Sequence, residues 1–322
     1  MPLSLRALSA ALAALLVLAG CDLVPGAPGD PDDPDDPDPP QAFDDTPAPL
    51  AAREHSTGSV VLRVVNTGYQ GAVLGGVVPS FQYGETNGLF EGRLVIGAGG
   101  DRIAGRPYGA AEEDWAAGSA LERVREVGVF SEGYRTRFGE AAAETDPLGL
   151  TVTQWSYSTF DPPADDAVVL VYDVRNDGPP RDALHVGLFA DFDLGASPGD
   201  DRSGFDAATE TVYVYDDTDG PAPFFGLTVI DGPLSGWSTT LRPTNAAFSD
   251  EQLYTALTTP GSVPETGGDR RTLLGVGPLS LDTGESARVA FAYVAGEEAG
   301  DLLVNAAAAR AAYRSAPVAA AD

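Results

Sequence analysis

Aspartates gather after two segments that have the pattern of β-strands, and carboxylate oxygens of this kind suit a hard divalent cation. One group ends the first segment and continues into a Gly/Ser/Pro-rich loop, and the other ends the next strand. The candidate ligands are Asp191, Asp193, Asp200, Asp201, Asp206, Asp216, Asp217 and Asp219. If the two strands pair as a hairpin, both groups reach one end of a sheet and surround Ca²⁺ at about 2.3–2.6 Å. The sequence therefore predicts a calcium site, with solvated acidic turns as the alternative.

Two pairs of aromatic residues have the spacing of neighbours on one strand face. Trp155 and Tyr157 form the first pair, and Tyr213 and Tyr215 form the second. Exposed aromatic rows stack on the apolar faces of sugars, so both pairs are candidate glycan-binding residues. Packing in the core is the alternative for each pair.

Catalysis by histidine or by a serine nucleophile has little support in the sequence. The chain has two histidines, and on a strand that rises about 3.3 Å per residue, His185 lies some 20 Å from Asp191. The run from Gly195 to Gly199 matches GxSxG, but Pro198 has no N–H to serve as an oxyanion donor. Two histidines and one cysteine also argue against a zinc site. We therefore expect no catalytic triad and no required cofactor, with Ca²⁺ as the one candidate ion.

Paired carboxylates offer a catalytic alternative, because two of them suffice for glycoside hydrolysis. The acids are too abundant to be ranked without distances. Those considered are Glu91, Glu112, Glu113, Asp114 and Glu126.

Strand-like segments of alternating polarity dominate the chain. In one of them Val168, Leu170, Tyr172 and Val174 share a face. The segments are 59–66, 72–78, 89–96, 124–130, 150–160, 166–175, 183–193, 211–215, 224–230, 272–281 and 286–294. So many short strands between polar turns predict a mainly β fold, a large antiparallel β-sandwich.

Two helices are expected. The first starts at Ser249, where the run to Gln252 has the spacing of a capping box, and reaches about Leu257. The second covers about 301–314, where Leu302, Ala306 and Ala309 recur on one side. We expect this C-terminal helix to pack its alanine-rich face on a sheet.

The single cysteine, Cys21, follows Leu18, Ala19 and Gly20 behind an apolar stretch and Arg6. This arrangement has the parts of an export signal and is shorter than the roughly 20 apolar residues of a membrane span. Leu-Ala-Gly-Cys resembles the bacterial lipobox, which implies cleavage after residue 20 and a lipid on Cys21. Residues 21–50 are then an Asp/Pro-rich tether that favours extended polyproline II, and 51–322 form the folded domain.

The charge of the chain limits its partners. The formal net charge is −29, and all basic residues are arginines without a dense patch, which excludes nucleic acid as a partner. Such acidity is typical either of a protein adapted to high salt or of one that binds calcium.

Three further segments resemble an uncharacterised β-sandwich module of exported bacterial surface proteins. They are 87–92, 187–195 and 277–281, the last continuing into the strand from Val289 and the final helix. The resemblance implies an exported sandwich and no functional residue. We therefore expect a lipid-anchored protein of the bacterial cell envelope, at the outer membrane or the cell surface rather than the inner membrane. Its expected role is non-catalytic, binding a glycan or an envelope protein, with a carbohydrate-active enzyme using paired carboxylates as the alternative.

Overall fold

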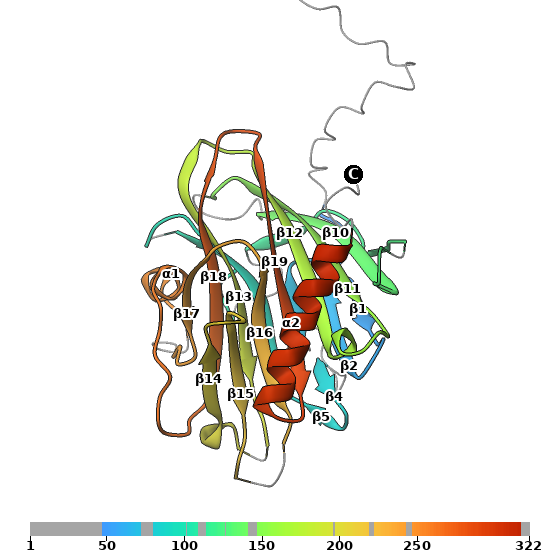
Figure 1. Cartoon of the computed structure of the whole chain (residues 1–322). Coiled ribbons are helices and arrows are strands. Elements are labelled where there is room, and N and C mark those ends of the chain that lie inside the picture. Colours follow the sequence, from blue (N-terminus) through green and yellow to red (C-terminus); the bar gives the residue numbers. More distant parts are fainter. Residues whose placement is uncertain are drawn as a thin grey trace, which may run out of the picture. The chain divides into compact units, whose positions relative to one another are not determined.

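Residues of alternating polarity form two large antiparallel sheets in the computed structural model, which we call the first and the second sheet (Figure 1). The structure describes residues 47–71, 80–100, 102–108, 114–125, 127–140, 147–195, 197–218, 222–242 and 247–316. The strands dominate this part of the chain, and a C-terminal helix packs on them. The predicted β-sandwich is therefore confirmed.

The first sheet runs in the order β17-β18-β13-β6-β3-β2-β4-β5, with β1 paired to β2 and β7 paired to β6. Its strands are β1 (Ala52–His55), β2 (Val60–Val65), β3 (Tyr69–Gly71), β4 (Phe81–Tyr83), β5 (Thr86–Asn87), β6 (Leu89–Gly97), β7 (Ile103–Ala104), β13 (Arg181–Phe192), β17 (Leu234–Ser238) and β18 (Arg270–Leu281). Its centre is thus formed by three long strands, β6, β13 and β18.

The second sheet runs in the order β14-β15-β16-β19-β12-β11-β10-β8, with β9 paired to β10. Its strands are β8 (Trp115–Ala117), β9 (Glu122–Arg123), β10 (Glu132–Glu140), β11 (Leu150–Ser158), β12 (Ala167–Asn176), β14 (Arg202–Asp206), β15 (Thr211–Tyr215), β16 (Phe224–Asp231) and β19 (Ser286–Gly296). Two single turns of 3₁₀ helix, Ala164–Asp166 and Pro198–Asp200, lie between strands.

The main hydrophobic core lies between the two sheets. Every second residue of a strand points into it, as Leu188 and Ala190 of β13 and Leu170 and Tyr172 of β12 illustrate. The predicted shared face of β12 is therefore confirmed. The outward-facing residues of the same strands are available to pack against the helices or to form a site.

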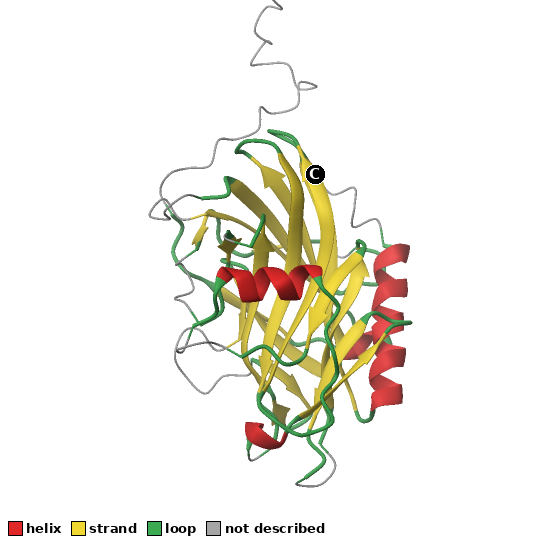
Figure 2. Ribbon diagram, turned by 90° about the vertical axis from the view of Figure 1, so that its left-hand side faces the viewer, coloured by secondary structure: helices red, strands yellow, loops and turns green. Residues whose placement is uncertain are grey.

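Each outer face carries one helix, and Figure 2 shows α1 and α2 on different sides of the strands. Helix α2 (Ala299–Ser315) buries Leu302, Ala306 and Ala309 against the second sheet, as predicted. Helix α1 (Asp250–Thr258) begins with the predicted capping box of Ser249 and lies on the first sheet. Neither helix in these described ranges is long and apolar enough to cross a membrane.

Glycines explain how closely α1 approaches the first sheet. Gly187, Gly275 and Gly236 are direct neighbours across β13, β18 and β17. A Cβ on Gly275 would lie 2.4 Å from the carbonyl oxygen of Leu257, and one on Gly236 would lie 2.6 Å from that of Ala256. Only a strip without side chains lets the helix backbone lie this close to the strands.

Two of the predicted strands are not confirmed. The segment 72–78 lies outside the described residues. The segment 124–130 is wrong as a strand: its described part holds a turn with one isolated bridge between Val127 and Phe130. Gly128, with a φ of +60°, bends the backbone there into the left-handed region and breaks the extended run.

Candidate active site

A row of charged side chains crosses the outer face of the first sheet. Glu91 of β6 lies directly opposite Asp191 of β13, and Asp191 lies directly opposite Arg271 of β18. All three point away from the main core because their neighbours Ala190 and Gly92 face it. Antiparallel register therefore joins acids and a base from three distant parts of the sequence.

Tyr108 covers this row. Its backbone N–H donates to both oxygens of Glu91, at 3.0 and 3.1 Å. Its hydroxyl donates to Oδ2 of Asp191 at 2.6 Å and accepts from Nε of Arg271. Its ring stacks on Phe248, with the centroids 5.5 Å apart. Tyr108 has a φ of +68°, a conformation that is uncommon for a side-chain-bearing residue and that points to a constrained site.

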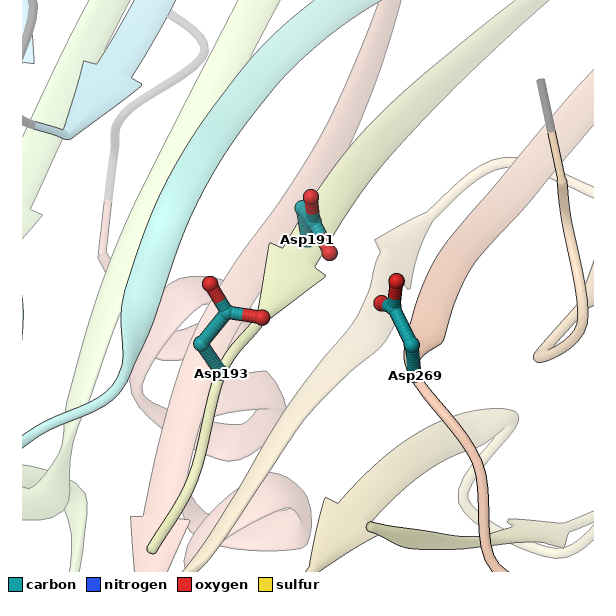
Figure 3. A group of neighbouring side chains, drawn as sticks. All are labelled: Asp191, Asp193 and Asp269. Carbon is teal, nitrogen blue, oxygen red and sulfur yellow. The ribbon is translucent and has the colours of Figure 1, made fainter. Parts of the chain in front are cut away.

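Three aspartates meet at the end of this row (Figure 3). Asp191 is the penultimate residue of β13, Asp193 directly follows the strand, and Asp269 immediately precedes β18. One carboxylate oxygen from each lies within 4.8 Å of the other two. The alternation of the strand and the nearby start of its neighbour thus place three acids around one point.

The three acids differ in their partners. Asp269, with a side chain 39% exposed, forms an ion pair of 2.7 Å with Nη2 of Arg271. Asp191 is 3% exposed; its Oδ2 lies 3.5 Å from Nε of Arg271, and its Oδ1 is buried without a hydrogen-bond partner among the described residues. Asp193 is half-buried, and its carboxylate makes no hydrogen bond or ion pair within the described part of the chain.

Burial makes two of these carboxyl groups weaker acids. It raises the pKa of Asp191 to about 7, against the opposing effects of the Tyr108 hydroxyl and of Arg271. Burial also raises the pKa of Asp193, and the charge of Asp269 adds to this effect. A carboxyl group of raised pKa therefore lies next to a carboxylate that is paired with arginine, a combination that acid–base catalysis can use.

The predicted calcium ligands divide into separate groups. Asp191 and Asp193 belong to the cluster just described, whereas Asp201 and Asp216 are buried beside the turn at Leu194 and Gly195. Of the rest, Asp200 is exposed, Asp206 bonds Thr209, Asp217 pairs with Arg202, and Asp219 lies outside the described residues. The calcium site therefore stays a prediction, and Asp191, Asp193 and Asp269 are the residues placed to hold the ion.

The hairpin on which that prediction depended is wrong. Strand β13 lies in the first sheet and β15 in the second, where β15 pairs with β14 and β16. Their ends still meet, because a Cβ on Gly195 would lie 1.8 Å from Oδ2 of Asp216. The ends of β13 and β15 therefore approach each other from the two sheets of the sandwich, and not within one hairpin.

The two predicted aromatic pairs differ in how deeply they are buried. Trp155 and Tyr157 share a face of β11, as predicted, but they are only 3% and 1% exposed, within the cluster beneath α2. Their assignment as an exposed glycan platform is therefore corrected: they are core residues. Tyr213 and Tyr215 are half-buried, and Tyr215 stacks on Phe224 with the ring centroids 4.6 Å apart.

Both histidines have structural partners. Buried His55 bonds Ser158 through Nδ1 at 2.8 Å and Ser156 through Nε2 at 2.7 Å, which ties β1 to the second sheet. His185 lies 3.0 Å from the Ser235 hydroxyl. Burial lowers the pKa of each imidazole. Neither histidine belongs to the acidic cluster.

Sequence reasoning found part of the site and missed its other half. Of the acids considered for paired-carboxylate chemistry, Glu91 lies in the row, Asp114 bonds Arg106, and Glu112, Glu113 and Glu126 lie outside the described residues. Asp269, Arg271 and Tyr108 were missed. In the sequence, Asp269 and Arg271 alternate at the start of a strand, and this pattern could have identified them as residues of one face. Sequence alone, however, does not show which strand lies beside this one in the sheet.

No protein-family model matches the chain, and no curated protein matches it in sequence. Solved structures of similar fold were found. A bacterial glucoamylase complexed with acarbose is 11% identical at a TM-score of 0.54, and the match covers 79% of this chain and 33% of that one. A putative aldose 1-epimerase from Escherichia coli K12 is 11% identical at a TM-score of 0.42, covering 76% and 99%. A putative kojibiose phosphorylase from the human microbiome is 9% identical at 0.41, covering 81% and 33%.

The chain thus spans about a third of the length of the glucoamylase that it resembles. At these identities the likeness is one of fold. The similarity to the glucoamylase nevertheless corrects two expectations, the non-catalytic binding or structural role and the absence of enzyme activity, because that protein of similar fold is a carbohydrate-active enzyme. It favours the alternative stated from the sequence, a carbohydrate-active enzyme using paired carboxylates, which is taken up below as a proposal.

Proposed function

We propose that the chain is a carbohydrate-active enzyme that uses Asp193 and Asp269 as its paired carboxylates. One observation carries the proposal: the two acids approach within 4.8 Å, one without a partner and half-buried, the other ion-paired with Arg271. The likeness in fold to a glucoamylase supports a carbohydrate as the substrate. Carboxylates about 5–5.5 Å apart are typical of retaining glycosidases, and those of inverting enzymes are farther apart.

In this proposal Asp269 attacks the anomeric carbon while protonated Asp193 gives its proton to the leaving oxygen. The bond to the leaving group breaks and an ester forms between the sugar and Asp269. Asp193, now ionised, then takes a proton from the water that displaces the ester, which restores both groups. Arg271 positions Asp269 through their ion pair and is not itself a reacting group.

The test is the release of reducing ends from neutral oligosaccharides and polysaccharides. We expect Asp193→Asn and Asp269→Asn each to lower kcat by about 10²–10⁴-fold, because each removes a proton-transfer or nucleophilic group. Asp217→Asn, at an exposed ion pair with Arg202, is the matched control and keeps wild-type kcat. Product formed with retained anomeric configuration agrees with the short spacing. Wild-type turnover by Asp269→Asn contradicts the proposal.

Cation binding is a second candidate function for the same cluster. It is favoured by Asp191, which offers one carboxylate oxygen within 4.8 Å of oxygens of Asp193 and Asp269. Its Oδ1 is also buried with no hydrogen-bond partner among the described residues. We expect Ca²⁺ to raise the Tm of the wild-type chain, since an ion that binds only the folded state stabilises it. Calorimetry of Asp269→Asn, which removes one charged ligand, should show a smaller rise. Equal rises in the two proteins argue against this use of the cluster.

A chelator separates the two functions. Paired carboxylates act without a metal, so EDTA leaves kcat unchanged if Asp193 and Asp269 work as an acid and a nucleophile. Loss of activity in EDTA and its return with added Ca²⁺ would instead assign the cluster to a cation.

A further inference from the structure

A pocket of about 500 Å³ lies beside α1 on the first-sheet side of the molecule. The end of β17, the segment 240–242 and the exposed side of α1 form its walls. Its polar lining includes the side chains of Arg242, Glu251 and Thr255, which make no hydrogen bond or ion pair with other described residues. Trp237, held by stacking on Phe205 with the centroids 4.2 Å apart, closes one wall. Pockets of this size with a few converging polar groups are typical of small-ligand sites.

The pocket adjoins the acidic cluster. The N–H of Leu241, a lining residue, donates to the backbone oxygen of Arg271 at 3.2 Å. The guanidinium of Arg242 reaches the residue before Asp269, because a Cβ on Gly268 would lie 3.5 Å from its Nη2. One wall of the pocket therefore adjoins the backbone at the start of β18, one residue before Asp269 of the candidate active site.

We propose that this pocket is the subsite that holds a sugar unit of a neutral glycan next to Asp193 and Asp269, an inference that rests on the proposed function. Planar charged groups such as those of Arg242 and Glu251 bond pairs of sugar hydroxyls, one as donor and the other as acceptor. The net charge of −29 disfavours an anionic glycan, which the acidic surface repels.

Binding is measured by calorimetry with maltotriose, cellotriose and trigalacturonate, using the full chain with Asp193→Asn to prevent turnover. In that background we expect Arg242→Ala to weaken binding of a neutral trisaccharide about tenfold, because a charged hydrogen-bond donor is lost. Glu251→Gln, which keeps the shape and removes the charge, should weaken it less. Arg314→Ala, at an exposed position of α2, and Glu298→Gln, at the exposed residue directly before α2, are the matched controls and keep the affinity.

Three results overturn the inference: no binding of either neutral trisaccharide, unchanged affinity in Arg242→Ala and Glu251→Gln, or tighter binding of trigalacturonate. Failure of the proposed function alone gives a different result. Neutral trisaccharides then bind and Arg242→Ala weakens that binding, but either the wild-type chain shows no turnover or Asp269→Asn retains the turnover. Conversely, if turnover requires Asp269 but Arg242→Ala leaves the KM unchanged, the subsite is disproved and the proposed function is supported.

Discussion

Arg271 is the side chain that gives the three aspartates different surroundings. It pairs with Asp269, approaches Asp191, and donates to the Tyr108 hydroxyl. Asp193 has none of these contacts among the described residues and keeps a raised pKa through burial and the neighbouring charge of Asp269. Environment rather than residue type therefore distinguishes these carboxyl groups, and this difference underlies the separate roles that we propose for Asp193 and Asp269.

Buried Asp201 predicts a pH dependence of stability at the residue scale. It is fully buried, and burial raises the pKa of its carboxyl to about 8, with smaller contributions from the charges of Asp216, Asp193 and Asp269. The folded chain thus holds a proton that the unfolded chain loses above its ordinary pKa of 3.8. The stabilisation from this group is complete below 3.8 and is lost as the pH rises through about 8.

We therefore expect the Tm of the wild-type chain to fall between pH 6 and pH 9 by more than the Tm of Asp201→Asn, whose amide cannot ionise. Exposed Asp200→Asn is the control and should follow the wild-type profile. Differential scanning calorimetry across this pH range measures the effect. Parallel profiles for wild type and Asp201→Asn would show that the carboxyl is not protonated in the fold.

At the scale of elements, β13 organises the site because it lies between β6 and β18 in the first sheet. Its outward residues change in character along the strand: Gly187 leaves room for α1, Phe189 packs beneath it, and Asp191 belongs to the charged row. One strand thus carries both the platform for the helix and an acid of the cluster. The position of α1, and of the pocket beside it, depends on the glycines.

Gly275→Val tests this dependence. The new side chain would meet the backbone of Leu257, with its Cβ 2.4 Å from the carbonyl oxygen, so α1 must move away from the sheet. We expect a loss of about 1–3 kcal/mol in the free energy of unfolding, the usual result of overpacking, measured by urea denaturation. Gly100→Val is the control, because a Cβ there meets only Tyr254, at 3.9 Å. Equal stability of the two variants would show that α1 does not need the glycine strip.

At the scale of the whole molecule, the acidity and the predicted anchor bear on the substrate and the location that we propose. Acids outnumber bases throughout the chain, which keeps such a surface soluble and repels anionic polymers. Cys21 and the Asp/Pro-rich tether lie outside the described residues, except for 47–50, so the lipid anchor stays a prediction. The substrate class that we propose, a neutral glycan of the cell envelope or of its surroundings, agrees with both features.

The anchor is tested by Cys21→Ser. A lipid-modified chain partitions with membranes because its acyl chains are buried in the bilayer, so we expect this variant to move to the soluble fraction. Fractionation of cells expressing each form, with immunoblotting, gives the measurement. Ser4→Ala changes a residue ahead of the apolar run and should leave the partition unchanged. A Cys21→Ser chain that stays with the membranes would disprove lipid attachment at this position.

The sequence by itself determined the features that depend on local pattern. Alternation in β12 and β19, the capping box at Ser249 and the alanine face of α2 all followed from the spacing of side chains along one element. It also placed Asp191 and Asp193 at a strand end. Only the tertiary structure decided which strands are neighbours, that Asp269 and Arg271 complete the cluster, and that Trp155 is buried beneath α2. The reason is physical: a strand's own pattern specifies which residues share a face, whereas contacts with other strands and helices specify what that face meets.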